Sequence, residues 1–202
     1  MGSGQVQGGA SSKLRGGLLP ACMAAASLLV ELAGNAGRQA LRFERSAVQA
    51  GEAWRLLTGH FAHLGWRHLL LNLAGLLLVW LLVGQRFDRR QWLVVIALTV
   101  LGIDLGFWLL DPDLDWYVGL SGLLHGVLVA GLAARIGDGS REALILLLII
   151  VGKLLWEQLI GPMPGSESLA GDSVVVNAHL YGAIAGGLAG MVVIRVRSAR
   201  PI

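Results

Sequence analysis

Six apolar segments, each close to the length that crosses a lipid bilayer, constrain the fold of this chain more than any other feature. They lie at residues 18–34, 66–84, 91–110, 119–136, 142–160 and 175–194. A membrane-spanning helix needs about 20 predominantly apolar residues. The segments are rich in leucine, valine and alanine, and they lack the apolar–polar alternation of a half-buried strand. The sequence therefore predicts an all-α membrane protein with six transmembrane helices.

The composition and the charge agree with this class. Of the 202 residues, 55% are hydrophobic and 14% are charged, whereas soluble domains carry about 25% charged residues. The net charge of +3 comes from basic residues that recur between the apolar segments rather than cluster in one stripe. This spacing is typical of residues that set membrane orientation, and no nucleic-acid partner is expected. The single cysteine, Cys22, can form no internal disulfide.

The distribution of basic residues predicts which ends of the helices face the cytoplasm. If the amino terminus is cytoplasmic, the segments on that side hold Lys13, Arg15, Arg86, Arg89, Arg90, Arg135, Arg141, Arg195, Arg197 and Arg200. The outer segments 111–117 and 161–174 contain no Lys or Arg. Because cytoplasmic loops carry the excess of Lys and Arg, we expect both termini in the cytoplasm.

Two segments outside the apolar runs have distinct compositions. Residues 35–65 lie on the outer side but carry four arginines among Leu, Phe and Trp residues: Arg38, Arg42, Arg45 and Arg55. This pattern favours an amphipathic element in the membrane interface, and the alternative is an ordinary solvated loop. Residues 1–12 are rich in Gly and Ser, which predicts a flexible segment before a single membrane domain at 13–202.

Polar residues within the predicted spans gather at one depth. Ser121 and His179 each lie about one turn into a span that begins at the outer face, and His68 and Asn72 lie in the first turns of another. Buried polar residues in membrane helices are costly and often functional. A hydroxyl, two imidazoles and an amide are therefore expected in the same outer third of the membrane.

These groups fit nucleophilic acyl transfer. A serine hydroxyl needs a neighbouring base to take its proton, and histidine can accept and return one. The oxyanion that forms needs donors already in place, such as backbone N–H groups and Asn or His side chains. His68 and Asn72 are four residues apart and share a helix face. Glycines beside the serine and histidine let helices approach closely; these are Gly119, Gly122, Gly126, Gly182, Gly186 and Gly190.

Other interpretations of the polar residues remain open at this point. A lone serine in a membrane helix often bonds its own backbone, and a lone histidine can be a satisfied packing residue. A transporter would use Asp104, Lys153 and Glu157 as an ion path, although Lys153 and Glu157 are four apart and can simply pair. The chain has no HExxH motif, so a zinc metalloprotease is discarded. No cofactor or metal is expected.

Three motifs, in order along the chain, resemble those of the rhomboid proteases. The stretch WRLLTGHFAHLGWRHLLLN at 54–72 is similar to their Trp-Arg loop and HxxxN helix, GLSG at 119–122 to their GxSG motif, and AHLYGAIAG at 178–186 to AHxxGxxxG. The resemblance implies a six-helix rhomboid-type bundle with an interfacial first loop. It implies Ser121 as nucleophile and His179 as general base. Asn72 and His68 would then be oxyanion donors, and Trp54 and Arg55 would anchor the loop.

The motif GLSGLLHG at 119–126 is also similar to a bacterial branch of the family, the rhombosortases. That similarity implies cleavage of secreted proteins at a carboxy-terminal tail with a Gly-Gly motif, a hydrophobic helix and basic residues; the alternative is a general rhomboid protease. The expected location is the bacterial inner membrane, with the site toward the periplasm and membrane-anchored proteins as substrates. Oligomeric state is left open, and the segment 141–160 is only a candidate gate. His125 stands where many rhomboids have an aromatic; we expect it either to orient His179 or to be purely structural.

Overall fold

Six long helices form the body of the molecule in the computed structural model, which describes residues 8–171 and 173–198. These are α1 (Gly8–Leu32), α5 (Trp66–Val83), α6 (Arg89–Leu110), α7 (Ser121–Gly137), α8 (Arg141–Leu159) and α10 (Val176–Ser198). Each coincides with one apolar segment of the sequence, so the prediction of an all-α bundle is confirmed. Of the predicted flexible segment 1–12, residues 1–7 lie outside the described residues and the remainder belongs to α1.

The length and composition of the helices identify a multi-pass membrane protein. Among the described residues, α5, α6 and α10 are long and apolar enough to cross a bilayer. A fourth candidate is α1 with α2 (Gly34–Leu41), which continues it after a bend of 118°. α7 is apolar but shorter, and α8 carries four charged residues. The number of six spans therefore stays a prediction.

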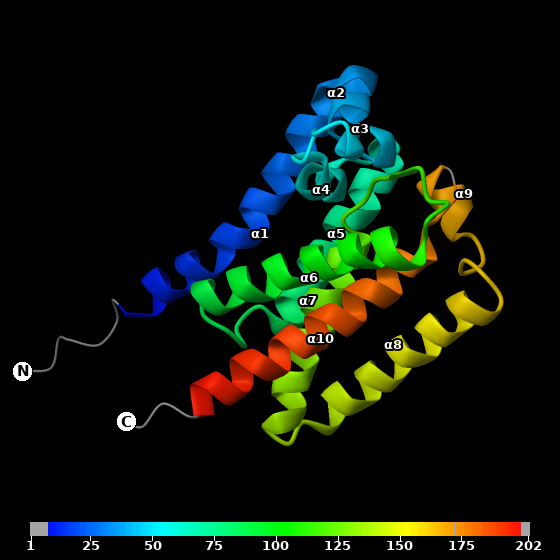
Figure 1. Ribbon diagram of the computed structural model, residues 1–202. Coiled ribbons are helices and arrows are strands. Elements are labelled where there is room, and N and C mark those ends of the chain that lie inside the picture. The colour runs from blue at the N-terminus through cyan, green and yellow to red at the C-terminus, as the bar shows by residue number, and fades with distance from the viewer. Residues whose placement is uncertain (1–7, 172, 199–202) are drawn as a thin grey trace, which may run out of the picture.

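α7 and α10 form the centre of the bundle. α10 packs against α6, α7 and α8, and α5 packs against the other side of α7 (Figure 1). The largest buried cluster lies around α7 and includes Trp92, Leu120, Leu123, Val127 and Leu132. The first turns of α5, α7 and α10 thus reach one end of the same packed core.

Glycines allow α7 and α10 to touch through their backbones. A Cβ atom on Gly122 would lie 2.8 Å from the carbonyl oxygen of Ala178, and one on Gly126 would lie 2.6 Å from that of Gly182. Conversely, a Cβ on Gly182 would collide with the carbonyl of Gly122, and one on Gly186 with that of Gly126. Small residues at this spacing permit close helix crossing in membranes, and here they bring the starts of the two helices together.

The segment predicted to be interfacial folds into short elements over one end of the bundle. α2 is followed by β1 (Phe43–Glu44), α3 (Arg45–Gln49), α4 (Arg55–Thr58) and the 3-10 turn η1 (Gly59–Phe61). β1 pairs antiparallel with β2 (Trp116–Tyr117), with Phe43 opposite Tyr117. This two-residue pairing was not anticipated from the sequence. It fixes the strand that leads into α7.

Two arginines hold this outer segment in place. The Arg45 guanidinium donates to the carbonyls of Phe107 (2.6 Å), Asp111 (2.7 Å) and Leu114 (3.0 Å), where α6 ends. Arg55 is buried and donates to the carbonyls of Gln39 (2.8 Å) and Arg42 (2.9 Å) as well as to Glu52. Backbone carbonyls left free at helix ends and turns are satisfied in this way. The segment is therefore tied to the bundle through several hydrogen bonds.

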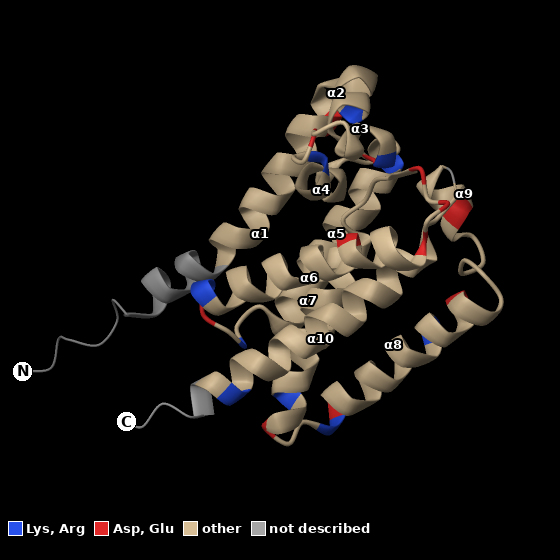
Figure 2. Ribbon diagram, viewed as in Figure 1, with Lys and Arg blue, Asp and Glu red and all other residues tan. Residues whose placement is uncertain are grey.

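Charged residues gather at both ends of the bundle. Basic residues lie where α6 and α8 begin and where α7 and α10 end, with acidic residues in the same turns (Figure 2). At the other end, acidic residues mark the loops near α9 (Ser166–Ala170), and basic residues lie in the short elements α2 to α4. An ion pair of 3.0 Å between Arg86 and Asp138 joins the α5–α6 turn to the α7–α8 turn. Ser121 begins α7 and therefore lies at the opposite end from these basic turns.

Candidate active site

The hydroxyl of Ser121 meets the imidazole of His179 between α7 and α10. The Oγ of Ser121 is 2.9 Å from the Nε2 of His179, which is a hydrogen-bond distance. His179 is only 5% exposed, and Ser121 is half-buried. The glycine crossing explains this contact, because both residues lie in the first turn of a helix whose backbone touches the other.

His125, one turn further along α7, packs against His179. The two rings stack with centroids 4.4 Å apart and an interplanar angle of 22°. The Nδ1 of His125 is 2.8 Å from the carbonyl oxygen of Ser121. A carbonyl oxygen can only accept, so Nδ1 carries the proton and Nε2 is left as an acceptor. The stack on His179 is a contact through which His125 could orient that ring, and the bonded carbonyl belongs to His125's own helix, α7.

Lys153 and Glu157 on α8 complete the polar cluster, and the sequence interpretation missed this. The Glu157 carboxylate oxygens are 3.0 and 3.2 Å from the Nδ1 of His179. The Lys153 ammonium is 2.7 Å from Glu157, 2.9 Å from the Nε2 of His125 and 3.1 Å from the Nδ1 of His179. The predicted pairing of Lys153 with Glu157 is present, but the pair faces the site. Lys153 and Glu157 lie at about the same depth below the outer face as Ser121 and His125, counted from the outer end of the segment 142–160. This shared depth could have indicated that they belong to the site.

His68 lies beside the turn that precedes Ser121. The backbone N–H of Leu64 donates to the Nδ1 of His68 (3.3 Å), which places the His68 proton on Nε2. A Cβ on Gly119 would lie 3.1 to 3.3 Å from the His68 ring, and Gly119 has a φ of +131°. Glycine alone suits both the conformation and the approach. The Nε2 edge of His68 therefore reaches the start of α7.

His63 supports the His68 ring and was not singled out from the sequence. It is almost fully buried, and its ring meets that of His68 edge-to-face with centroids 5.0 Å apart. Its Nδ1 donates to the carbonyl of Phe61 at 3.1 Å. Burial lowers the pKa of His63 to about 3, so the ring is neutral at physiological pH. A neutral ring adds no charge beside His68.

Asn72 lies one turn deeper than His68 and is buried. Its side-chain amide donates to the backbone carbonyl of His68 at 3.0 Å rather than to Ser121. The structure thus brings His68 to the cavity beside Ser121 and holds Asn72 behind it. The oxyanion role of Asn72 stays a prediction.

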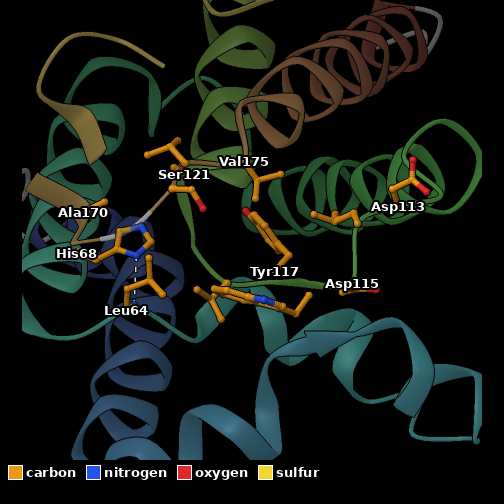
Figure 3. A pocket seen from close by; sticks show the side chains of 13 residues that line it. Leu64, His68, Asp113, Asp115, Tyr117, Ser121, Ala170 and Val175 are labelled. Carbon is orange, nitrogen blue, oxygen red and sulfur yellow. Dashed lines mark hydrogen bonds between the residues drawn. The ribbon is translucent and has the colours of Figure 1, made fainter. Parts of the chain in front are cut away.

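A cavity of about 250 Å³ opens beside Ser121. Figure 3 shows His68, Ser121 and Tyr117 around it, with Asp113 and Asp115 toward its other end. The Tyr117 hydroxyl donates to the carbonyl of Gly119 at 2.6 Å. Burial raises the pKa of Tyr117, which keeps this hydroxyl protonated and able to donate. The cavity runs from the Ser121 hydroxyl to the exposed carboxylates of Asp113 and Asp115, which gives it a route to water.

Asp104, the third residue of the transporter alternative, lies apart from this cluster. It is buried in α6, and its Oδ1 is 3.4 Å from the Nε2 of His60 in η1. Lys153 and Glu157 contact the two histidines of the site instead. In the part of the chain that the structure describes, no group of three His, Cys, Asp or Glu side chains is arranged to hold a metal ion.

Comparison with known proteins places the chain in a family. A model of the rhomboid domain matches residues 50–196, most of the chain. "RHOMBOID-like protein 5" of Arabidopsis thaliana is 29% identical over 158 residues, covering 75% of this chain and 47% of that protein. "Rhomboid-like protein 11, chloroplastic" of the same plant is 28% identical over 143 residues, covering 66% and 50%.

The chain belongs to the rhomboid family. The matched region contains Ser121, His179, His68 and Asn72. The chain spans about half the length of the curated relatives it matches. The resemblance inferred from the three motifs is thereby confirmed at the level of the family.

Proposed function

We propose that this protein is an intramembrane serine endopeptidase with Ser121 as nucleophile and His179 as general base. The observation that carries the proposal is the 2.9 Å contact between the Ser121 Oγ and the His179 Nε2 beside a cavity with a route to water. Membership of the rhomboid family supports it. A transporter is not favoured, because the charged residues it would use are engaged with these histidines or with His60.

The proposed reaction proceeds by acyl transfer. As the Ser121 Oγ attacks the carbonyl carbon of the substrate, its proton passes to the His179 Nε2 and the carbonyl π electrons move to the oxygen. The tetrahedral intermediate collapses, the C–N bond breaks, and Nε2 returns the proton to the leaving amine. Water then attacks the acyl-enzyme carbonyl as His179 takes a proton from it. The ester C–Oγ bond breaks, the carboxyl product leaves, and Nε2 returns the proton to the Ser121 Oγ. Both steps use one base, which must alternate between accepting and releasing a proton.

The oxyanion needs donors at the start of α7. The backbone N–H of Ser121 lies at a helix N-terminus, where amides lack an intrahelical acceptor. The Nε2–H of His68 faces the same turn across Gly119. Asn72 would join them if its amide turned from the His68 carbonyl toward the cavity. Preplaced donors of this kind stabilise charge that develops only in the transition state.

The proposed setting is the bacterial inner membrane, with both termini cytoplasmic and the site toward the periplasm. The basic residues at the ends of the helices away from Ser121 support this orientation, because such residues favour the cytoplasmic side. Substrates would be membrane-anchored proteins that are cut near the outer membrane boundary.

We further propose that the substrates carry carboxy-terminal Gly-Gly tails. The similarity of GLSGLLHG to the rhombosortases motivates this. Glycine also suits the cleavage point, because it eases the local unwinding that exposes a helical peptide bond.

Replacing the two glycines of such a tail by leucines is expected to stop cleavage. The leucines would strengthen the helix at the bond to be cut, because leucine favours helix far more than glycine does. The measurement is mass spectrometry of products after incubation of purified protein with the wild-type and Leu-Leu tails. A matched tail with leucines placed four residues further into its hydrophobic helix is the control. Equal cleavage of both variants would favour a general rhomboid protease.

His125→Phe is expected to keep much of the activity, whereas His125→Ala is expected to lose most of it. A phenyl ring preserves the stack that holds His179, and alanine leaves His179 without its neighbour. A time course of labelling by a serine-directed phosphonate compares both variants with wild type. If Phe is as slow as Ala, the polar atoms of His125 matter; if Ala matches wild type, His125 is structural.

A further inference from the structure

Glu157 stands out among the residues of α8 because it is a buried carboxylate. Only three residues of this helix are buried, namely Ala143, Leu154 and Glu157. Glu157 is 3% exposed, although many leucines and isoleucines of α8 face outward. A buried ionised carboxylate is costly unless it is paired and hydrogen-bonded. Its partners here are the Lys153 ammonium and the His179 imidazole.

We propose that Glu157 is a positioning residue that accepts the Nδ1–H of His179 and so presents the bare Nε2 to Ser121. The inference rests on the proposed protease activity and adds a third member to its Ser-His pair. A neutral imidazole has one donor nitrogen and one acceptor nitrogen. If Nδ1 donates to Glu157, Nε2 carries a lone pair 2.9 Å from the Ser121 Oγ. It can then take the serine proton.

Lys153 competes for the same nitrogen, and the distances decide between them. If Lys153 donated to Nδ1, the His179 proton would lie on Nε2 and point at the Ser121 hydroxyl, an arrangement that cannot accept the serine proton. The Lys153 ammonium has closer acceptors in Glu157 at 2.7 Å and in the Nε2 of His125 at 2.9 Å. Its separation from the His179 Nδ1 is 3.1 Å. Lys153 is therefore satisfied without that nitrogen.

His125 fits the same assignment. Its Nδ1 donates to the Ser121 carbonyl, so its Nε2 accepts a hydrogen bond from Lys153 and has no proton to donate to Glu157. The carboxylate is left to His179 and Lys153. When His179 takes the serine proton it becomes a cation, and the negative charge of Glu157 beside Nδ1 stabilises it. In the Ser-His-Asp template, the buried carboxylate has the same two effects.

Glu157→Gln tests the charge while preserving the shape. The amide can donate to Nδ1 and so favour the unproductive tautomer; replacing the carboxylate by an amide in a Ser-His-Asp triad lowers kcat by about 10⁴-fold. We expect kcat to fall by at least about 10²-fold, with KM changed little, because the carboxylate does not touch substrate. Glu157→Asp keeps the charge and is expected to retain more activity than Gln. A role in packing alone predicts the opposite order, since Gln matches the shape of Glu.

The pH profile supplies a second readout. A neighbouring carboxylate favours the protonated imidazole, so its loss makes His179 harder to protonate. The acid limb of kcat/KM is therefore expected to move to lower pH in Glu157→Gln and to stay near its wild-type position in Glu157→Asp. The other titratable groups that face His179 are His125 on α7, His68 on α5 and Lys153 on α8, and they are unchanged in both variants.

The experiment measures cleavage of a tail substrate and phosphonate labelling of Ser121 by the full chain in detergent or lipid. Glu142→Gln, the same change at an exposed site where α8 begins, is the control and should leave both rates unchanged. If the wild-type chain neither cleaves nor labels at Ser121, the proposed function fails. If wild type is active and Glu157→Gln matches it, or loses rate with an unmoved acid limb, the role of Glu157 is overturned.

Discussion

Ser121→Ala is expected to abolish cleavage and labelling while the protein stays folded. The nucleophile and its base act as a unit, and losing the nucleophile of a soluble serine protease costs on the order of 10⁶ in kcat. Alanine keeps the Cβ of Ser121 and removes only the oxygen that contacts His179. His179→Ala should lose activity to a similar extent. Product analysis by mass spectrometry and labelling by a fluorescent phosphonate measure the two effects.

Ser27→Ala is the matched control for this change. Ser27 is a fully buried serine in α1, and its hydroxyl has no hydrogen-bond partner among the residues that the structure describes, so alanine removes no interaction seen there. The control should cleave and label as wild type does. Cleavage at the wild-type rate by Ser121→Ala would show that another group attacks the substrate, and the proposed mechanism would be wrong.

The helices of this protein could be predicted from the sequence because the bilayer imposes their length. Each predicted apolar segment coincides with a helix in the described part of the chain. The depth of each residue in the membrane could also be predicted, because its distance from the end of its span follows from its position in the sequence. Ser121, His179 and His68 were brought together on that basis. The structure places all three around one end of α7.

The rotation of each helix about its own axis could not be predicted from the sequence in the same way. A membrane helix that is apolar on every side carries no stripe to show which face is buried. α8 illustrates this: Lys153 and Glu157 visibly shared one face, but nothing in the sequence showed that the face meets His125 and His179. The same limit applies to Asn72, whose amide turns toward its own helix.

Contacts made by the outer segment were also beyond the sequence. The pairing of Phe43 with Tyr117 joins positions far apart in the chain and involves only two residues on each strand. Such a short ladder leaves no alternating pattern. The pattern of residues 35–65 predicted an amphipathic segment but not that the Arg45 guanidinium binds three carbonyls near the end of α6. The conformations of Phe43, Tyr117 and Arg45 are therefore set by tertiary contacts rather than by a local sequence pattern.

Gly182→Ala is expected to remove most of the activity and to lower the stability of the bundle. A Cβ at this position would collide with the backbone carbonyl of Gly122, which belongs to a helix and cannot move aside as a side chain would. Overpacking a tight interior costs about 1–3 kcal/mol. α10 must also shift away from α7, and a displacement of about 1 Å between reacting groups can lower the rate by about 10²-fold. His179 lies one turn before Gly182 and would move with it.

Two other glycines make a graded series that separates this collision from the general effect of a methyl group. Among the described residues, a Cβ on Gly187, on the same helix, would meet only the tip of Val129 at 3.1 Å, and one on Gly152 in α8 would have no neighbour within 4 Å. Alanine is favoured over glycine within helices by up to about 1 kcal/mol, so Gly152→Ala should be neutral or slightly stabilising. Unfolding in a denaturing detergent and the labelling rate of Ser121 are measured for all three. The expected order of damage is Gly182, then Gly187, then Gly152. Equal effects at the three sites would mean that backbone contact between α7 and α10 does not set the distance from Ser121 to His179.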